Sequence, residues 1–374
     1  MSENRPKPRV AVVFGGRSSE HSISCVSAAS VLRAIDRDVY DVVPIGISPA
    51  GRWMLVPDDP ARLEIVEGKL PQVDEGYPVV LAGDPTAHAL TVTENGAPTG
   101  VLGKLDVVFP VLHGPYGEDG TIQGLLELAD IPYVGSGVLA SAVSMDKVYM
   151  KVALAGAGLP VGPHVVVMPR RWAAAADAVR AQVAALGWPV FVKPARGGSS
   201  VGISKVNGPE DFAAAMALAQ EWDPKVIVEA ALPGREIECG VLEGFPAADG
   251  IPTTPEASVP AEIRVTGGRE FYDFEAKYLE NSTELTVPAE LPAAVADAVR
   301  RLSVLAFEAL SCEGLARVDF FVDGTNIVIN EVNTMPGFTS VSMFPTMWAK
   351  TGVDYPTLVD RLLRTALARR PGLR

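Results

Sequence analysis

Four polar side chains interrupt two apolar runs near the C-terminus, within RVDFFVDGTNIVINEVNTMPG at residues 317–337. The runs of Val, Ile and Phe predict the strands of a β-hairpin, because Asp323-Gly324-Thr325 between them is a strong turn signal. Side chains alternate faces along a strand, so polar residues two positions apart share a face. The interrupting residues follow that alternation: Arg317, Asp319, Glu331 and Asn333.

The register of the hairpin decides whether these polar groups meet. A three-residue loop at 323–325 pairs residue 319 with 329 and residue 317 with 331, which places all four groups on one face. A two-residue Asp-Gly turn would instead separate the two carboxylates. Two carboxylates, an amide oxygen and a guanidinium suit hard cations and phosphate. The alternative is a solvated outer face of an antiparallel sheet.

Other polar and glycine-rich segments stand at the ends of predicted strands. KPARGGSSVG (193–202) has glycines that let backbone N–H groups wrap an anion, although it lacks the spacing of a P-loop. GGRSSEH (15–21) and HGPYGEDG (113–120) follow strands of the first predicted sheet, at the edge where open α/β sheets bind ligands. The first of them lacks the Gly-x-Gly-x-x-Gly fingerprint of a nicotinamide-dependent dehydrogenase. These segments favour a binding site over a merely solvated hairpin.

Three successive units are predicted to position these residues, giving an α/β fold with an α+β C-terminal part. Residues 1–136 form an open parallel sheet, with a β-rich insertion at about 51–104. Residues 137–230 begin with a helix at 142–156 and contain the Gly-rich loop. Residues 231–374 hold a long polar loop at about 262–284, the hairpin and a C-terminal helix.

Composition excludes several classes of protein. The net charge of −13 and the absence of a basic patch argue against nucleic-acid binding. No apolar run is long enough to span a membrane, and the N-terminus lacks a signal-peptide core, so we expect a cytoplasmic protein. Cys25, Cys239 and Cys312 are widely spaced and odd in number, which indicates buried free thiols rather than disulfides or a zinc site.

Taken together, the motifs resemble the D-alanine–D-alanine ligases of the ATP-grasp superfamily. The resemblance covers every predicted unit in order and leaves out residues 51–104, which are similar to an extra segment of longer members. The matching runs are GGRSSEHSIS (15–24), HGPYGEDGTIQGLLELADIPYVGSG (113–137), MDK (145–147), KPARGGSSVGISKV (193–206), FYDFEAKYL (271–279) and ARVDFFVDGTNIVINEVNTMPGFTSVSMFP (316–345).

The resemblance implies a three-domain ATP-grasp fold and ATP-dependent synthesis of D-alanyl-D-alanine through a D-alanyl phosphate, for peptidoglycan precursors. It implies ATP as co-substrate and two Mg²⁺ ions, for which Mn²⁺ can substitute, and it implies a homodimer. The loop at 262–284 is expected to be a lid over the site. The implied metal ligands are Asp319, Glu331 and Asn333, and the implied ATP-binding residues are Lys147, Lys193, Ser200, Glu229, Leu232, Glu236 and Tyr272.

The remaining implied roles concern the amino acids. Glu20, Ser199 and Tyr278 form a hydrogen-bonded triad that links three domains, while Arg317 and the Gly337 N–H stabilise an oxyanion. The implied D-alanine-binding residues are Glu20 and His113 for the first molecule and Lys277, Ser342 and Met343 for the second. One departure from the family pattern is Ala230, where members often have Lys after the adenine-contacting Glu.

Two other functions stay open on the sequence. A D-alanine–D-lactate ligase has the same fold, although Lys277-Tyr278 favours the dipeptide enzyme. A non-catalytic amino-acid sensor on an ATP-grasp scaffold would have lost its metal ligands, yet Asp319, Glu331 and Asn333 are all present.

Overall fold

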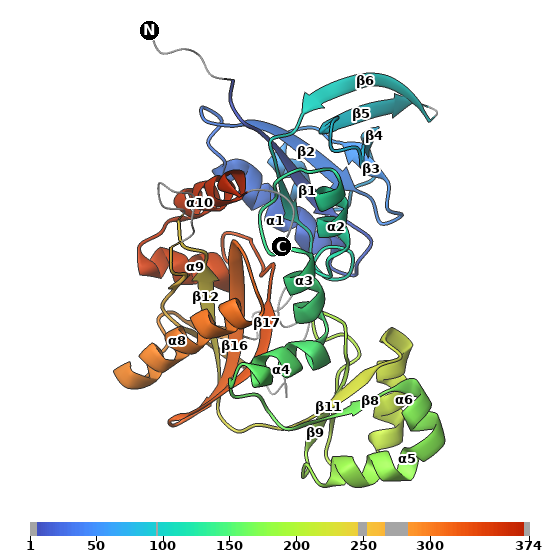
Figure 1. Cartoon of the computed structure of the whole chain (residues 1–374), viewed down its shortest axis with the longest axis vertical. Helices are drawn as coiled ribbons and strands as arrows, with labels where there is room; N and C mark the ends of the chain where they lie inside the picture. The colour runs from blue at the N-terminus through green and yellow to red at the C-terminus, as the bar shows by residue number, and fades with distance from the viewer. Residues whose placement is uncertain (1–5, 95, 246–252, 266–282, 370–374) are drawn as a thin grey trace.

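The computed structural model describes residues 6–94, 96–245, 253–265 and 283–369 (Figure 1). Three sheets, each with helices packed on it, are built from successive parts of the chain, which confirms the predicted α/β class. None of the helices in these described ranges combines the length and the hydrophobicity that crossing a bilayer requires.

The N-terminal sheet has seven strands in the order β6-β5-β4-β3-β2-β1-β7. β1 lies parallel to both β2 and β7, and helix α1 makes the crossover from β1 to β2, whereas β3–β6 add antiparallel strands beyond β2. The segment 51–104 is therefore β-rich, as predicted, and it extends this same sheet. The elements are β1 (Arg9–Gly15), α1 (His21–Ala34), β2 (Asp41–Ile47), β3 (Trp53–Leu55), η1 (Pro60–Leu63), β4 (Tyr77–Leu81), β5 (Ala89–Glu94), β6 (Ala97–Lys104), β7 (Val107–Val111) and α2 (Thr121–Leu128).

The central sheet has four strands in the order β10-β9-β11-β8. The helix predicted at 142–156 is two helices, because Asp146 is extended (φ −94°, ψ 102°) and its carboxylate accepts from the N–H groups of Val148 and Tyr149. This cap starts a new helix at Lys147. The elements are α3 (Val138–Met145), α4 (Lys147–Gly156), β8 (His164–Val167), α5 (Pro169–Ala184), β9 (Val190–Pro194), β10 (Ser204–Val206), α6 (Phe212–Trp222) and β11 (Val226–Ala230).

The C-terminal sheet has the order β15-β14-β12-β16-β17, with β13 paired to β12. Its last helices cover the N-terminal sheet, since Phe338, Trp348 and Leu362 share one buried core with Val10 and Phe109. Figure 1 shows α10 lying beside α1. The elements are β12 (Arg235–Leu242), β13 (Glu256–Ala257), β14 (Ala261–Val265), β15 (Thr283–Thr286), α8 (Ala293–Ala309), β16 (Leu315–Asp323), β17 (Asn326–Asn333), α9 (Met343–Thr351) and α10 (Tyr355–Ala368).

The predicted polar loop at 262–284 is wrong at both of its ends. Residues 262–265 and 283–286 are antiparallel partners in β14 and β15, where alternating side chains such as Ile263 and Leu285 suit a strand. Residues 266–282, which carry the predicted lid, lie outside the described residues.

The hairpin has a different register from the predicted one. Asp323 pairs with Asn326, so the loop has two residues and the predicted three-residue loop is wrong. A β-bulge then shifts the register between Asp319 and Phe320, with Asn330 as the extra residue on β17. Asp319 consequently lies opposite Glu331. The polar groups share one face as predicted, but the cause is the β-bulge and not a three-residue loop.

Candidate active site

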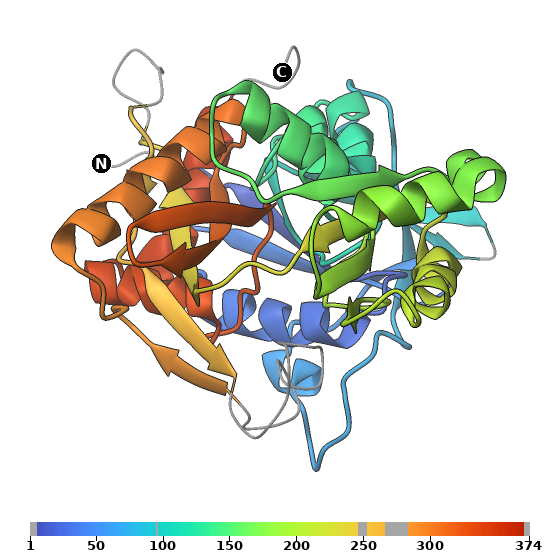
Figure 2. The same cartoon turned by 90° about the horizontal axis from the view of Figure 1, so that it is seen from below.

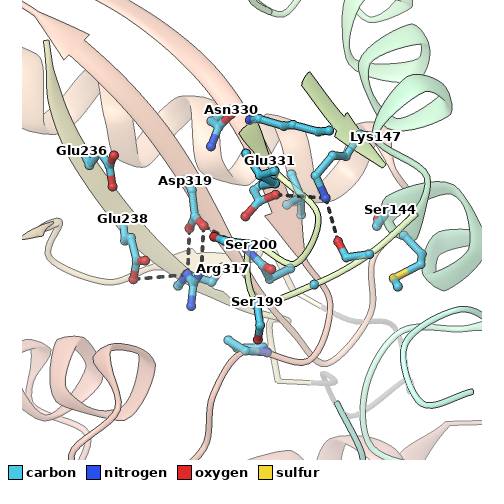
Figure 3. Close-up of a pocket in the computed structure, with 18 of the residues that line it drawn as sticks. Ser144, Lys147, Ser199, Ser200, Glu236, Glu238, Arg317, Asp319, Asn330 and Glu331 are labelled. Carbon is cyan, nitrogen blue, oxygen red and sulfur yellow. Dashed lines mark hydrogen bonds and ion pairs between the residues drawn. The ribbon is translucent and has the colours of Figure 1, made fainter. Parts of the chain in front are cut away.

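A cavity of about 390 Å³ is lined by residues from all three parts of the chain (Figure 3). Figure 2 shows the ribbon of these parts from a second direction. The walls of the cavity come from the start of α1, the end of β7, the Gly-rich loop after β9, and strands β11, β12, β16 and β17. Most of the predicted site residues line it: Glu20, His113, Lys147, Lys193, Ser199, Ser200, Glu229, Leu232, Glu236, Arg317, Asp319, Glu331, Asn333 and Gly337.

The hairpin forms the most polar wall of this cavity. Arg317 donates from Nε and Nη2 to the two Asp319 carboxylate oxygens at 2.7 Å each, and its Nε lies 3.2 Å from Glu238 Oε2. Asn333 Nδ2 also donates to Asp319, at 3.0 Å. Burial alone would lower the pKa of Arg317, but Asp319 and Glu238 outweigh it and raise that pKa well above its usual value. The guanidinium is a permanent positive charge in the wall.

Two lysines line the cavity beside the hairpin and the neighbouring central sheet. Lys147 Nζ donates to the Gly197 carbonyl at 2.9 Å and lies 3.6 Å from Glu331 Oε2 (Figure 3). Lys193 Nζ lies 2.5 Å from Glu229 Oε2. Burial lowers the pKa of Lys193, but Glu229 more than compensates and raises it. The Lys193 ammonium therefore stays charged, and both lysines line the cavity, where they can face phosphate oxygens.

Glu229 is buried between two lysines. Its Oε1 lies 2.8 Å from Lys151 Nζ, and its Oε2 contacts Lys193. Burial would raise the pKa of Glu229, yet the two ammonium groups lower it below the usual carboxyl range. Because both carboxylate oxygens are engaged, any contact with an adenine from this residue would come from its backbone.

The Gly-rich loop is anchored at its base and crosses to the N-terminal domain at its tip. Asp223 accepts from the Arg196 N–H, Nε and Nη2 at 2.8–2.9 Å. At the tip, the Ser199 hydroxyl donates to the Glu20 carboxylate, so two of the three predicted triad members are in contact. Ser199 and Ser200 have φ of +50° and +59°, a backbone conformation that is unusual for residues other than glycine.

His113 is buried near Glu20 in the wall of the cavity. Its Nδ1 lies 3.2 Å from the Met335 carbonyl and 3.7 Å from Glu118 Oε1, and its Nε2 lies 3.1 Å from Ser27 Oγ. Burial lowers the pKa of His113, but the hydrogen bond and charge of Glu118 raise it overall. This pair can hold a positive charge close to a carboxylate.

The predicted residues for the second amino acid are divided. Ser342 does not line the cavity, but its hydroxyl accepts from the Thr339 N–H at 3.1 Å and lies next to Gly337, where an added Cβ would meet it at 3.2 Å. Met343 is buried in a small core with Ala261 and Ile263 and does not line the cavity. Tyr272, Lys277 and Tyr278 lie outside the described residues.

The hairpin donors fit a hard cation. The carboxylates of Asp319 and Glu331 face each other across the bulge, with Asn333 beside Asp319, and oxygen donors of this kind suit Mg²⁺. Within the described ranges no group of three or more His, Cys, Asp and Glu side chains could hold a metal by itself. A cation here would take its other ligands from water and from a phosphate-bearing substrate.

Sequence reasoning missed Lys151, Asp223 and Glu238. Each contacts a predicted site residue or loop from a distant part of the chain. Lys151 lies four residues after Lys147 on α4, so helical spacing could have placed both on one face. The sequence holds no comparable signal for the other two.

Models of one protein family match both halves of the chain. The model described as "D-ala D-ala ligase N-terminus" matches residues 9–136, and "D-ala D-ala ligase C-terminus" matches residues 153–364. A D-alanine–D-alanine ligase of Kineococcus radiotolerans is 60% identical over 99% of this chain and 100% of its own length. One of Streptomyces griseus is 57% identical, over 99% of this chain and 95% of its own length.

Solved structures give the same result. The VanG D-Ala:D-Ser ligase of Enterococcus faecalis has a TM-score of 0.82 at 34% identity, covering 97% of this chain and 100% of its own. The D-alanine–D-alanine ligase of Coxiella burnetii has a TM-score of 0.80 at 33% identity, with 97% and 95% covered. Since the family models and the curated relatives together span nearly the whole chain, the protein belongs to the D-alanine–D-alanine ligase family.

Proposed function

We propose that this protein joins two D-alanine molecules to D-alanyl-D-alanine, with ATP as the phosphoryl donor, in the synthesis of peptidoglycan precursors. The observation that carries the proposal is the contact between Glu20 and Ser199 inside the cavity. Through this contact the Glu20 carboxylate, which can bind the ammonium of an amino acid, lies against the Gly-rich loop, which can bind phosphates. Residues of the hairpin line the same cavity.

ATP would occupy the side of the cavity between the central and C-terminal sheets. Lys147, Lys193 and the Ser200 region would face its phosphates, because two lysines and the Gly-rich loop line that side of the cavity. Leu232 and Glu236 would meet the adenine and the ribose, together with the Glu229 backbone and Tyr272.

The hairpin would hold the metal. Asp319, Glu331 and Asn333 supply the oxygen donors for two Mg²⁺ ions, or Mn²⁺ in their place. When bound, the ions neutralise the negative charge of the phosphate groups during phosphoryl transfer.

The protein's own groups have separate tasks in the reaction. Glu20, with its carboxylate fixed by Ser199, binds the ammonium of the first D-alanine and leaves the amino acid's carboxylate free to accept the γ-phosphoryl group. The second D-alanine, with its amine deprotonated, then attacks the carbonyl carbon of the acylphosphate; the C–N bond forms, and the C–O bond to inorganic phosphate breaks. Arg317 and the Gly337 N–H stabilise the oxyanion that develops on the attacked carbonyl.

The second D-alanine would be bound by its carboxylate near Ser342 and Met343, with help from Lys277. Tyr278 would complete the triad with Glu20 and Ser199, and the segment that carries it would exclude water from the acylphosphate. We also propose the division into domains at residues 136 and 230 and a cytoplasmic location, both of which the sequence patterns predict, and a homodimer, which the family resemblance implies.

Phosphate release with ATP and Mg²⁺ tests this proposal. D-Alanine is expected to support turnover with D-alanyl-D-alanine as the product, and L-alanine is not. Adding D-lactate or D-serine to D-alanine distinguishes the depsipeptide and mixed-dipeptide ligases, since mass spectrometry separates the three products. Turnover independent of D-alanine would refute the proposal.

A further inference from the structure

Lys151 is a buried charge with two partners, and no step of the proposed reaction uses it. It lies on α4 with its side chain only 3% exposed. Its Nζ donates to the Asn330 backbone carbonyl at 3.0 Å and forms the ion pair with Glu229 at 2.8 Å. A buried lysine is rare unless its charge and its donors are satisfied, and here the main chain of β17 satisfies one of them.

Asn330 is the extra residue of the β-bulge, and that position decides the geometry of the cation site. A bulge leaves its extra residue outside the regular ladder, so its carbonyl needs another donor. Without the bulge, the two-residue turn would place Asp319 opposite Asn330, and Glu331 would point to the other face of the sheet. The pairing of Asp319 with Glu331 therefore exists only while the bulge is held.

Helix α4 and the segment after it hold β17 on both sides of the bulge. The Ile329 N–H donates to the Pro160 carbonyl at 2.8 Å, and the Val332 N–H donates to Met150 Sδ at 3.2 Å. These bonds lie along the edge of β17 that does not pair with β16, where Ile329 also forms a parallel bridge with Val161. Lys151 supplies the bond between them, at the extra residue itself.

We infer that Lys151 is a positioning residue: it fixes the β-bulge at Asn330 and so keeps the carboxylates of Asp319 and Glu331 on one face, where they bind the catalytic cations. The inference rests on the cation site of the proposed function. Glu229 forms ion pairs with both Lys151 and Lys193. Lys151 on α4 therefore connects the hairpin to Lys193, which is predicted to contact the phosphates of ATP.

The test measures how much Mn²⁺ increases the affinity of the protein for ADP. Calorimetry gives the dissociation constant of ADP in the presence of Mn²⁺ and in the presence of EDTA, both without amino acid, and the ratio of the two is the Mn²⁺-dependent gain. Lys151→Met keeps the length of the side chain and removes the donor and the charge. We expect it to reduce the Mn²⁺-dependent gain by about ten- to a hundredfold, the effect of leaving one buried acceptor unsatisfied. Hydrogen exchange should rise at residues 328–333 and stay unchanged in β12.

Three variants accompany this change. Asn330→Ala deletes a side chain but keeps the carbonyl, so it should retain the gain. Lys350→Met removes an exposed lysine and controls for the loss of one charge. Lys151→Gln keeps a neutral donor and should retain part of the gain. If Lys151→Met does not fold, the same measurements on Lys151→Gln replace it.

The outcomes distinguish a failure of the role of Lys151 from a failure of the cation site. An undiminished gain in Lys151→Met, or a lost gain with unchanged exchange at residues 328–333, overturns the role of Lys151. A wild-type protein in which Mn²⁺ adds nothing to ADP affinity overturns the cation site itself and the inference with it.

Discussion

A single methyl group at Gly198 should disturb the contact between Glu20 and the Gly-rich loop. Gly198 has no positive φ, so its backbone accepts alanine without strain. The added Cβ would lie 2.8 Å from Glu20 Oε2, and its three nearest neighbouring atoms all belong to the Glu20 carboxylate. The substitution Gly198→Ala is therefore a probe of one carboxylate.

The size of the effect follows from that distance. Ordinary contact begins at about 3.4 Å, so either the carboxylate or the loop must move by several tenths of an ångström. Overpacking of this kind costs about 1–3 kcal/mol. If the cost falls on the closed arrangement with the first D-alanine bound, kcat/KM for D-alanine falls by roughly 5- to 150-fold.

The neighbouring glycine provides the control. At Gly197 an added Cβ would meet only Pro194 Cβ, at 3.9 Å, which is an ordinary contact. Steady-state kinetics with D-alanine varied at saturating ATP should show a large loss for Gly198→Ala and a much smaller one for Gly197→Ala. Equal effects of the two changes would show that the loop, and not Glu20, is the sensitive element.

Two further predictions concern the support of the site and the buried thiols. Asp223→Asn removes the charge that accepts three N–H groups of Arg196, and because that guanidinium is half-exposed the cost should be about 2 kcal/mol. Thermal unfolding should start at a lower temperature and KM for ATP should rise more than KM for D-alanine; an unchanged KM for ATP contradicts the anchoring role. Burial raises the pKa of Cys25 and Cys312 to about 12 and that of Cys239 to about 11, so a thiol reagent at pH 8 should label none of the 3 cysteines in the native protein and all of them in denaturant. Rapid labelling of any native thiol would contradict this burial.

The sequence predicts most of the elements because their signals are local. Alternating apolar residues identified β16 and β17, and a Gly-rich stretch after a strand identified the phosphate loop. The predicted convergence of Asp319 and Glu331 was right, but the assumed loop was wrong, because a bulge changes register without leaving a mark in apolar periodicity. The extra residue of that bulge contacts Lys151 on α4, more than 170 residues earlier in the chain.

Other differences also come from tertiary structure. The break at Asp146 depends on a cap and on an ion pair with Lys225 at 2.5 Å, whereas apolar spacing alone favoured one continuous helix. Residues 262–265 were predicted to be a loop because they include two charged side chains. In the structure Glu262 forms an ion pair with Arg235 on the neighbouring strand β12. Pairwise charge partners of this kind cannot be inferred from a single sequence.

The most direct test of the central claim follows the oxygen atoms of D-alanine. If the cavity activates a carboxylate by phosphoryl transfer, D-alanine labelled with ¹⁸O in its carboxylate must transfer one labelled oxygen to the released phosphate. We predict one ¹⁸O in each phosphate formed together with D-alanyl-D-alanine, measured by mass spectrometry. Unlabelled phosphate released alongside the dipeptide would contradict the acylphosphate and the roles assigned to this site.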